Sequence, residues 1–246
     1  MKLLFTSDLH GREAAYTRFS ELLQSGGYEV GVIAGDLMTY PSEKAIEKAT
    51  GEFRHARGEG SGSVEDQRSF VERTAAKHDE RTLKGILKRS GKVVLFVMGN
   101  DDGLLGDGAE WKSDGLVANV NMRRVTYRGL PFVGYQFTNP YVGGPFEKSE
   151  REQEADFLTL ERLLDRGSVL ITHGPPAGTL DLVDERRHVG SEALRRLVDR
   201  RRPRLHLFGH IHQAFGIEGT SVNGAYPHSR KFFAIDTETL EARLVE

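Results

Sequence analysis

The stretch Leu205-His206-Leu207-Phe208-Gly209-His210-Ile211-His212 joins a short apolar run to a glycine and two histidines. Runs of this kind, rich in Leu, Val, Ile and Phe without strict alternation, are typical of strands buried on both faces. Imidazole is a common metal ligand, and residues i and i+2 just beyond a strand can both turn toward one pocket. The stretch therefore predicts a buried strand that carries metal-binding side chains at its carboxyl end.

Four other apolar runs end in the same way. In open α/β sheets, ligands bind outside the carboxyl ends of the strands. We therefore expect five strand ends of one sheet to converge on one site. Residues 3–5 lead into Asp8-Leu9-His10, residues 30–34 into Gly35-Asp36, residues 93–98 into Gly99-Asn100-Asp101-Asp102, and residues 169–171 into Thr172-His173-Gly174.

The histidines and glycines of these motifs strengthen the prediction. A lone histidine at a strand end is more often structural or solvated, but four of the nine histidines lie at these ends. The glycines before Asp36, Asn100 and His210 are expected where backbones crowd and a side chain would not fit. The conjunction favours one shared metal site over five unrelated turns.

The segments between the apolar runs favour one α/β domain over residues 1–246. Helical periodicity covers residues 12–25, 64–89, 150–166 and 191–201, with Ser191 as an expected N-cap. Residues 117–137 and 214–245 alternate, with turn pairs Arg128-Gly129, Glu218-Gly219 and Asn223-Gly224, which predicts hairpins. The composition of residues 57–63 predicts a flexible loop inside a helical insertion at residues 41–91.

Composition excludes several classes of protein. The chain has no cysteine, which rules out disulfides and thiolate-bound metals. Its net charge of −2 does not point to nucleic acid, although nucleic acid as a partner stays open. It has no apolar run of about 18 residues, so we expect no membrane span and a cytoplasmic location.

The ordered set Asp-x-His, Gly-Asp, Gly-Asn, His and Gly-His-x-His, from residue 8 to residue 212, resembles the calcineurin-like metallophosphoesterase superfamily. The motifs at residues 172–176 and 209–212 resemble its class III cyclic-nucleotide phosphodiesterase-like and MPPED-type branch. The resemblance implies two packed mixed β-sheets flanked by α-helices, a four-layer sandwich. It also implies ligands for a first metal (Asp8, His10, His212), for a second (Asn100, His173, His210), and a bridge between them (Asp36).

A site of this kind is expected to hydrolyse phosphate esters. Two divalent ions clamp a phosphoryl group and lower the pKa of a bound water, and the resulting hydroxide attacks phosphorus. Oxygen and imidazole ligands suit Mn, which we favour, as well as Fe, Zn, Ni or Mg. The expected substrate is a small-molecule phosphate ester, with nucleotides among the candidates.

The sequence departs from the family pattern at Asp101. Many members have Gly-Asn-His followed by an acid that orients the histidine, whereas this chain has Gly99-Asn100-Asp101-Asp102. A carboxylate would repel a dianionic monoester more than a monoanionic diester, so diesters are favoured. The candidate catalytic residues are Asp101, His10 and Asp102. Slow turnover, a protonated Asp101 acting as an acid, and Asp101 as an extra ligand stay open.

Other functions and residues were weighed on weaker signals. The alternatives are a phosphomonoesterase or nuclease, or a weakly active metal-binding scaffold, and the oligomeric state stays open. Arg12 and Asn223 are candidate substrate contacts, and residues 139–145, with Tyr141, are a candidate pocket loop. His206 and Trp111 are expected to pack in the core. The arginines of residues 195–204 are expected to form a solvated face, with a nucleic-acid contact as the alternative.

Overall fold

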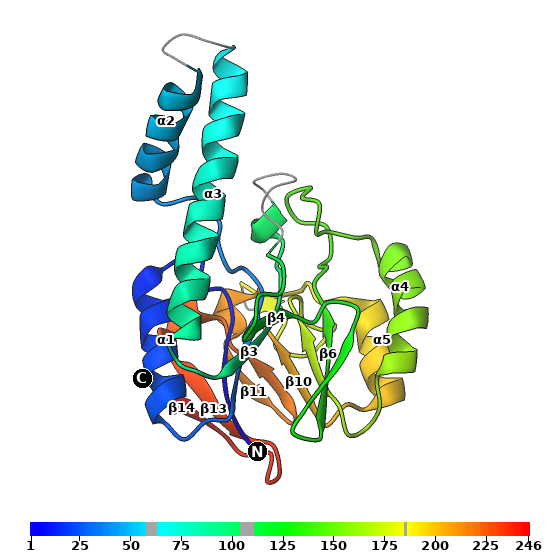
Figure 1. Ribbon diagram of the computed structural model, residues 1–246. Coiled ribbons are helices and arrows are strands. Elements are labelled where there is room, and N and C mark those ends of the chain that lie inside the picture. The colour runs from blue at the N-terminus through cyan, green and yellow to red at the C-terminus, as the bar shows by residue number, and fades with distance from the viewer. Residues whose placement is uncertain (58–62, 104–110, 185) are drawn as a thin grey trace.

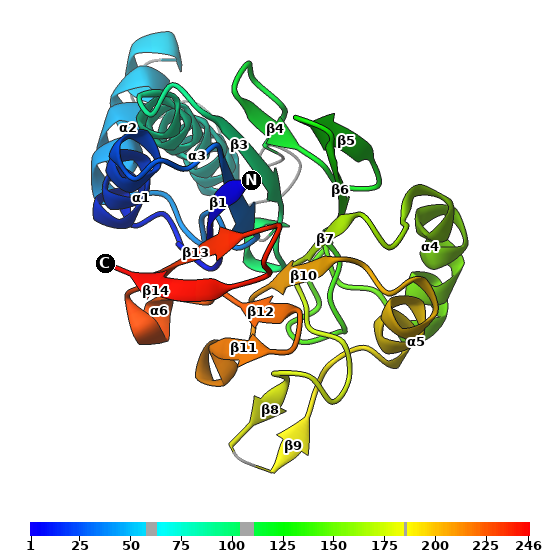
Figure 2. The ribbon, with the colours of Figure 1, turned by 90° about the horizontal axis from the view of Figure 1, so that it is seen from below.

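Two six-stranded sheets lie face to face, with helices on both outer faces (Figures 1 and 2). This computed structural model describes residues 1–57, 63–103, 111–184 and 186–246. The expected four-layer sandwich of mixed sheets is therefore confirmed. No helix among the described residues is both long and apolar enough to span a membrane.

The first sheet has the order β14-β13-β1-β2-β3-β4. Its strands β1 to β4 run parallel, and β13 and β14 are antiparallel to their neighbours. Each parallel strand thus ends at the same edge of the sheet. The bounds are β1 Lys2–Thr6, β2 Val30–Ala34, β3 Val93–Val97, β4 Val117–Asn119, β13 Phe232–Asp236 and β14 Ala242–Val245.

The second sheet has the order β11-β12-β10-β7-β6-β5. Strands β6, β7, β10 and β12 are parallel, and β5 and β11 form antiparallel hairpins with their neighbours. The bounds are β5 Arg124–Tyr127, β6 Leu130–Tyr135, β7 Val169–Thr172, β10 Leu205–Phe208, β11 Gly216–Glu218 and β12 Ser221–Asn223; a separate small hairpin joins β8 Leu182–Val183 to β9 Arg187–His188.

A buried apolar layer holds the two sheets together. Phe5 and Val32 of the first sheet and Phe132 and Leu207 of the second belong to one cluster, each fully buried. Burying such side chains stabilises the fold by about 1.5–3 kcal/mol each. The layer fixes how the strand ends of one sheet face those of the other.

Helices cover the outer faces. α1 (Glu13–Ser25) and the carboxyl half of α3 (Val64–Lys88) pack on the first sheet, and α4 (Glu150–Leu163) and α5 (Glu192–Arg201) on the second. The side chain of Ser191 accepts a hydrogen bond from Leu194 N, as expected of an N-cap. The short elements are η1 Asp101–Gly103, η2 His212–Ala214 and α6 Tyr226–Ser229.

Residues 41–91 contain α2 (Glu43–Arg57) and α3, which pack against each other and rise above the body in Figure 1. Phe53 and Val71 belong to a small separate core between them. Leu83 and Ile86, however, belong to the core over the first sheet. The carboxyl half of α3 therefore packs on that sheet and attaches this pair of helices to it. The status of the segment as an insertion stays a prediction, and residues 58–62 of the expected flexible loop lie outside the described residues.

Two details of the sequence-based fold were wrong. The five strand ends come from two sheets, because β7 and β10 belong to the second sheet while β1, β2 and β3 belong to the first. Asn223-Gly224 is no hairpin turn: β12 ends at Asn223, and the backbone N–H of Gly224 donates to Phe208 O while its carbonyl accepts from Ser7 N. The pair thus links both sheets.

Candidate metal centre

The carboxyl ends of β1, β2, β3, β7 and β10 meet at one edge of the sandwich. Backbone hydrogen bonds tie the ends together, from Asp8 N to Gly35 O at 3.0 Å within one sheet and from Gly209 N to His173 O at 3.0 Å within the other. The Nδ1 atom of His173 reaches Ala34 O at 2.8 Å and so crosses between the sheets. The predicted motifs therefore share one site.

One group of side chains consists of Asp8, His10 and His212, whose ligand atoms lie within 4.8 Å of one another. Asp8 Oδ1 lies 3.2 Å from His212 Nε2, and the Nε2 atoms of His10 and His212 are 3.3 Å apart. Asp8 is buried, whereas the two histidines are partly exposed. This geometry leaves the imidazole side of the group open to solvent.

A second group consists of Asp36, His173 and His210, again within 4.8 Å. His173 Nε2 lies 3.3 Å from Asp36 Oδ1 and 3.1 Å from the side-chain oxygen of Asn100. The other oxygen of Asp36 lies 4.0 Å from His10 Nε2 of the first group. Asp36 therefore stands between the two groups.

Four of these side chains sit on left-handed backbone. Asp8, His10, Asp36 and His210 have φ angles of 58°, 48°, 49° and 68°. Non-glycine residues rarely adopt such angles, and backbone strain of this kind clusters at functional sites. These left-handed residues follow β1, β2 and β10, where the chain turns sharply at the site.

The glycines before the ligands are required by crowding, as expected. A Cβ at Gly99 would lie 2.2 Å from Asp36 Oδ1, and one at Gly209 would lie 2.1 Å from Asp8 Oδ2. Real Cβ atoms do not approach other atoms so closely. These positions exclude any side chain while the site keeps its geometry.

The hydrogen bonds behind the imidazoles fix which nitrogen faces the site. A carbonyl only accepts, so His173 Nδ1–H donates to Ala34 O and leaves Nε2 facing the acids. His10 Nδ1 lies 2.6 Å from Thr39 Oγ1, which in turn donates to Asp101 Oδ2 at 3.1 Å. His10 therefore also presents Nε2. This is the arrangement that metal-ligating histidines need.

The charges of the site call for a cation. Burial raises the pKa of Asp36, but the charge and hydrogen bond of His173 outweigh burial, and the pKa is lowered. Burial lowers the pKa of His173, yet the charge of Asp36 raises it to about 10. The buried carboxylates thus favour a positive charge beside them, and a metal ion would supply that charge. The donor set fits divalent metal ions held by nitrogen and oxygen.

Asp101 lies at the rim of the site and Asp102 behind it. Asp101 is partly buried, and its ligand atom groups with those of His10 and Asp36. Asp102 is buried, and its two oxygens accept from the backbone N–H groups of Met38 and Gly99, both at 2.8 Å. The geometry does not support the prediction of Asp102 as a catalytic side chain. Its hydrogen bonds organise the turn instead.

The two candidate substrate residues differ in their surroundings. Arg12 is exposed just after His10, and within the described parts of the chain its guanidinium makes no hydrogen bond or ion pair. Asn223 is fully buried; its Nδ2 donates to Ile211 O at 2.9 Å and its Oδ1 accepts from Ala225 N at 3.1 Å. The prediction of Asn223 as a substrate contact is therefore wrong, because backbone groups occupy its amide.

Two residues that matter here carried little sequence signal. Thr39 connects His10 to Asp101, but a threonine three residues after Asp36 resembles any turn residue. Tyr141, weighed only by its loop, contacts the ring of His210 edge-on, with centroids 6.1 Å apart. Both contacts join segments far apart in the chain, which no local pattern encodes.

The residues expected to be structural are structural. His206 is buried, with Nε2 2.8 Å from Thr172 Oγ1, and burial lowers its pKa to about 3. Trp111 is buried between Tyr16 and Phe96.

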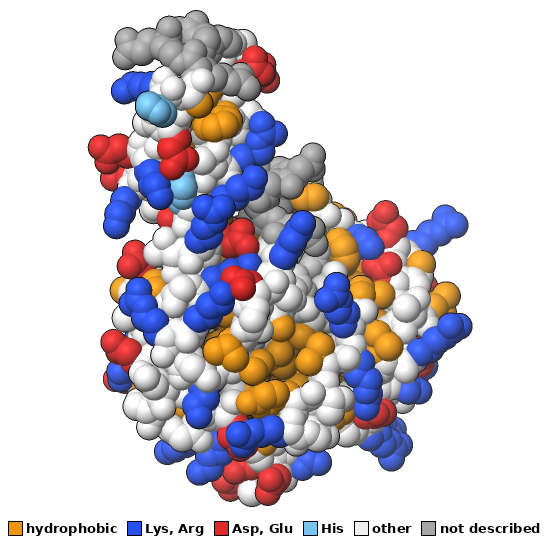
Figure 3. Space-filling model, viewed as in Figure 1, with side chains coloured by type: hydrophobic (Ala, Val, Ile, Leu, Met, Phe, Trp, Pro, Cys, Tyr) orange, Lys and Arg blue, Asp and Glu red, His pale blue; other side chains and the backbone are white. Residues whose placement is uncertain are grey.

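The arginines of residues 195–204 form ion pairs and hydrogen bonds within the chain. Three of the six form ion pairs with acids, and the other three donate to backbone carbonyls, as expected of side chains on a solvated face. On the face in Figure 3, basic and acidic side chains are likewise interspersed. The ion pairs are Arg195–Asp199, Arg196–Glu154 and Arg200–Glu161, and the carbonyl donors are Arg201, Arg202 and Arg204.

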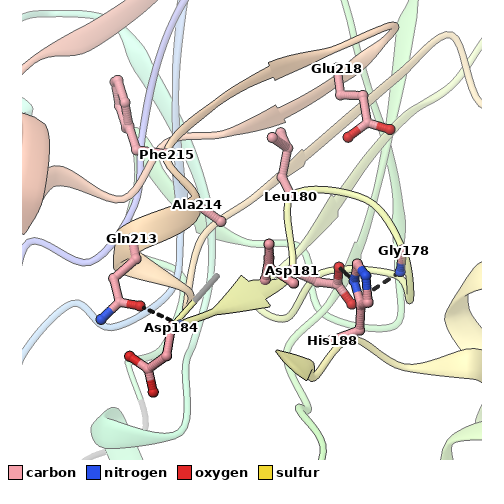
Figure 4. A pocket seen from close by; sticks show the side chains of 10 residues that line it. Gly178, Leu180, Asp181, Asp184, His188, Gln213, Ala214, Phe215 and Glu218 are labelled. Atoms are coloured by element: carbon pink, nitrogen blue, oxygen red, sulfur yellow. Dashed lines mark hydrogen bonds and ion pairs between the residues drawn. The ribbon is translucent and has the colours of Figure 1, made fainter. Parts of the chain in front are cut away.

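A cavity of about 720 Å³ lies beside η2, between β8 and β11 (Figure 4). None of the candidate ligands lines it. Its buried acid, Asp181, accepts hydrogen bonds from His188 Nδ1 at 2.6 Å and from the N–H groups of Gly178 and Gly190 at 3.0 Å. Asp181 thus holds the surrounding loops together.

The fold and site together define a class of protein: a two-sheet α/β sandwich with a candidate two-metal centre at the carboxyl ends of its parallel strands. The family model of the calcineurin-like phosphoesterases matches residues 1–214. The chain belongs to this family, whose members depend on metal ions, and membership supports hydrolysis of phosphoric esters.

Individual relatives agree with this assignment. The chain is 38% identical over 102 residues to human metallophosphoesterase domain-containing protein 1, covering 39% of this chain and 30% of that protein. It is 37% identical over 101 residues to a UPF0046 protein of Caenorhabditis elegans, covering 41% of this chain and 33% of that protein. The matches thus span about a third of each curated relative.

Solved structures share the fold. The crystal structure of the Thermus thermophilus protein TT1561 superposes with a TM-score of 0.66 at 16% identity, covering 100% of this chain and 98% of the other. A dimetal phosphatase from Danio rerio superposes with a TM-score of 0.51 at 11% identity, covering 95% and 91%. At these identities the likeness concerns the fold alone.

Proposed function

We propose that this chain is a phosphodiesterase that uses two divalent metal ions, Mn being the favoured metal. Asp8, His10 and His212 would hold one ion, and Asn100, His173 and His210 the other, with Asp36 between them. The observation that carries the proposal is the position of Asp36, 3.3 Å from His173 Nε2 and 4.0 Å from His10 Nε2. One carboxylate can thus serve both groups.

When bound, the ions would clamp a phosphoryl group and activate a water. The chain's own residues set the frame for this chemistry. Thr39 and Ala34 O orient the imidazoles of His10 and His173. Arg12, exposed beside the site, would bind a phosphate oxygen of the substrate.

The charge of the site favours diesters. The groups contain three carboxylates, those of Asp8, Asp36 and Asp101. In their ionised form they reduce the formal charge of two divalent ions to +1, which leaves little positive charge to offset a second negative charge on the substrate. A dianionic monoester would add a charge next to Asp101, where like charges repel.

The proposal is tested by removing metal and adding back Mn, Fe, Ni, Zn or Mg singly. We expect no hydrolysis by the metal-free protein and restored hydrolysis with at least one ion, with bis-p-nitrophenyl phosphate cleaved faster than p-nitrophenyl phosphate. Release of p-nitrophenolate measures both. No activity with any ion would contradict the proposal. It would favour a weakly active metal-binding scaffold, an alternative that arises because Asp101 stands where many family members have a histidine.

The role of Asp101 is tested by Asp101→His and Asp101→Asn. Asparagine removes the charge alone, and histidine also adds a donor. We expect the ratio of monoester to diester hydrolysis to rise in both variants, by roughly tenfold in Asp101→His. Repulsion between two unit charges at about 4 Å is worth about 1 kcal/mol in bulk water and more near a protein surface, and about 1.4 kcal/mol is a factor of ten. A ratio of kcat/KM values that stays unchanged in both variants would refute the charge argument.

A further inference from the structure

Tyr141 stands out among the exposed aromatic side chains by its neighbour. Tyr141 is 75% exposed, yet its ring lies at right angles to the imidazole of His210, with centroids 6.1 Å apart. His210 belongs to the second group of candidate ligands. An organic group attached to a phosphate at that site would lie within reach of this ring.

The backbone of the Tyr141 loop is held by one carboxylate. Glu147 accepts hydrogen bonds from the N–H groups of Tyr141, Val142 and Gly143, at 2.6, 2.9 and 2.9 Å. Burial raises the pKa of Glu147, but these backbone donors outweigh it and the pKa is lowered. The carboxylate therefore stays ionised at neutral pH and fastens three successive residues.

The two ends of the loop are fastened as well. The side-chain oxygen of Asn139 accepts from Gln153 Nε2 at 2.6 Å, and its Nδ2 donates to Val189 O at 3.3 Å. Thr138 N donates to Phe146 O at 3.1 Å. Such a loop has little conformational freedom to lose on binding, so an aromatic ring that it presents binds at low entropic cost.

We propose that Tyr141 forms a subsite for a planar aromatic group of the substrate, such as a nucleobase or an aryl ester. Every such group has a π-face, and a rigid exposed ring beside the phosphoryl position offers a stacking surface without hydrogen-bond selection. The inference rests on the proposed function, because it needs a phosphate bound at the metal centre.

Calorimetric titration of the Mn-loaded protein with AMP and with ribose 5-phosphate tests the subsite. The two ligands share the phosphate and the sugar, and only AMP has a base. We expect AMP to bind roughly tenfold more tightly than ribose 5-phosphate. Tyr141→Ala should abolish this difference and leave the affinity for ribose 5-phosphate unchanged, and Tyr141→Phe should keep it. Leu158→Ala, an exposed apolar truncation on α4, is the surface control.

Two results would overturn the inference. An AMP preference that persists in Tyr141→Ala would show that another group binds the base. A preference lost equally in Tyr141→Phe would show that the hydroxyl acts and not the ring. Hydrolysis of bis-p-nitrophenyl phosphate by the wild type tests the proposed function separately, so a chain that hydrolyses the diester but fails the titration refutes the subsite alone.

Discussion

Asp36→Asn is expected to lower kcat/KM for bis-p-nitrophenyl phosphate by roughly 10²- to 10⁴-fold, since bound metal ions stabilise the charge of the transition state by several kcal/mol and about 1.4 kcal/mol is a factor of ten. In the wild type, Asp101 N donates a hydrogen bond to Asp36 Oδ1 at 3.0 Å, and the side-chain oxygen of the asparagine can still accept it. It loses the charge that faces both His173 and His10. Metal content by mass spectrometry should fall together with activity.

A matched control separates this effect from a general loss of charge. Asp114→Asn removes an exposed carboxylate that pairs with Lys88 on the surface, and we expect unchanged activity and metal content. Circular dichroism should show that both variants are folded. Full activity and two bound ions in Asp36→Asn would contradict the bridging role.

Gly99→Ala is the second substitution with a large expected effect. Its Cβ would lie 2.2 Å from Asp36 Oδ1 and 2.6 Å from His173 Nε2, so one methyl group would displace two candidate ligands at once. Overpacking of this kind costs about 1–3 kcal/mol of folding free energy. Displacing a reacting group by about 1 Å costs roughly 10²-fold in rate. We expect both losses, measured by chemical denaturation and by steady-state kinetics.

The chain offers a control with the same substitution in open space. Gly85 lies inside α3, and a Cβ there would meet nothing within 4 Å. Gly85→Ala should therefore raise the free energy of unfolding by about 0.5–1 kcal/mol, since alanine loses less entropy than glycine in a helix. Its activity should not change. Wild-type activity in Gly99→Ala would show that the site tolerates a shift of Asp36.

The fold was predictable where the sequence pattern is local. Short apolar runs predicted the buried strands, and Ser191 predicted the start of α5 because an N-cap acts within one turn. The assignment of strands to sheets was not predictable, since β7 and β1 have similar composition and only long-range packing separates them. A pattern of single strands cannot encode that choice.

The candidate site shows the same division. The clustering of the candidate ligands was predictable because each follows a strand closely, and parallel strands end at one edge. Asn223 was predicted to contact the substrate because its amide follows the last metal motif in the sequence. Its hydrogen-bond partners, Ile211 O and Ala225 N, are backbone groups that only the fold reveals. Thr39 and Tyr141 were underweighted for the same reason, since their contacts with His10 and His210 are tertiary.

The most direct test of the two-metal centre is the number of Mn²⁺ ions bound per chain at saturation, followed by electron paramagnetic resonance. The position of Asp36 between the two groups predicts two ions per wild-type chain and a spectrum of two magnetically coupled ions, with the coupling lost in Asp36→Asn. A wild-type chain that saturates with one ion, or with two ions that show no coupling, would contradict the account.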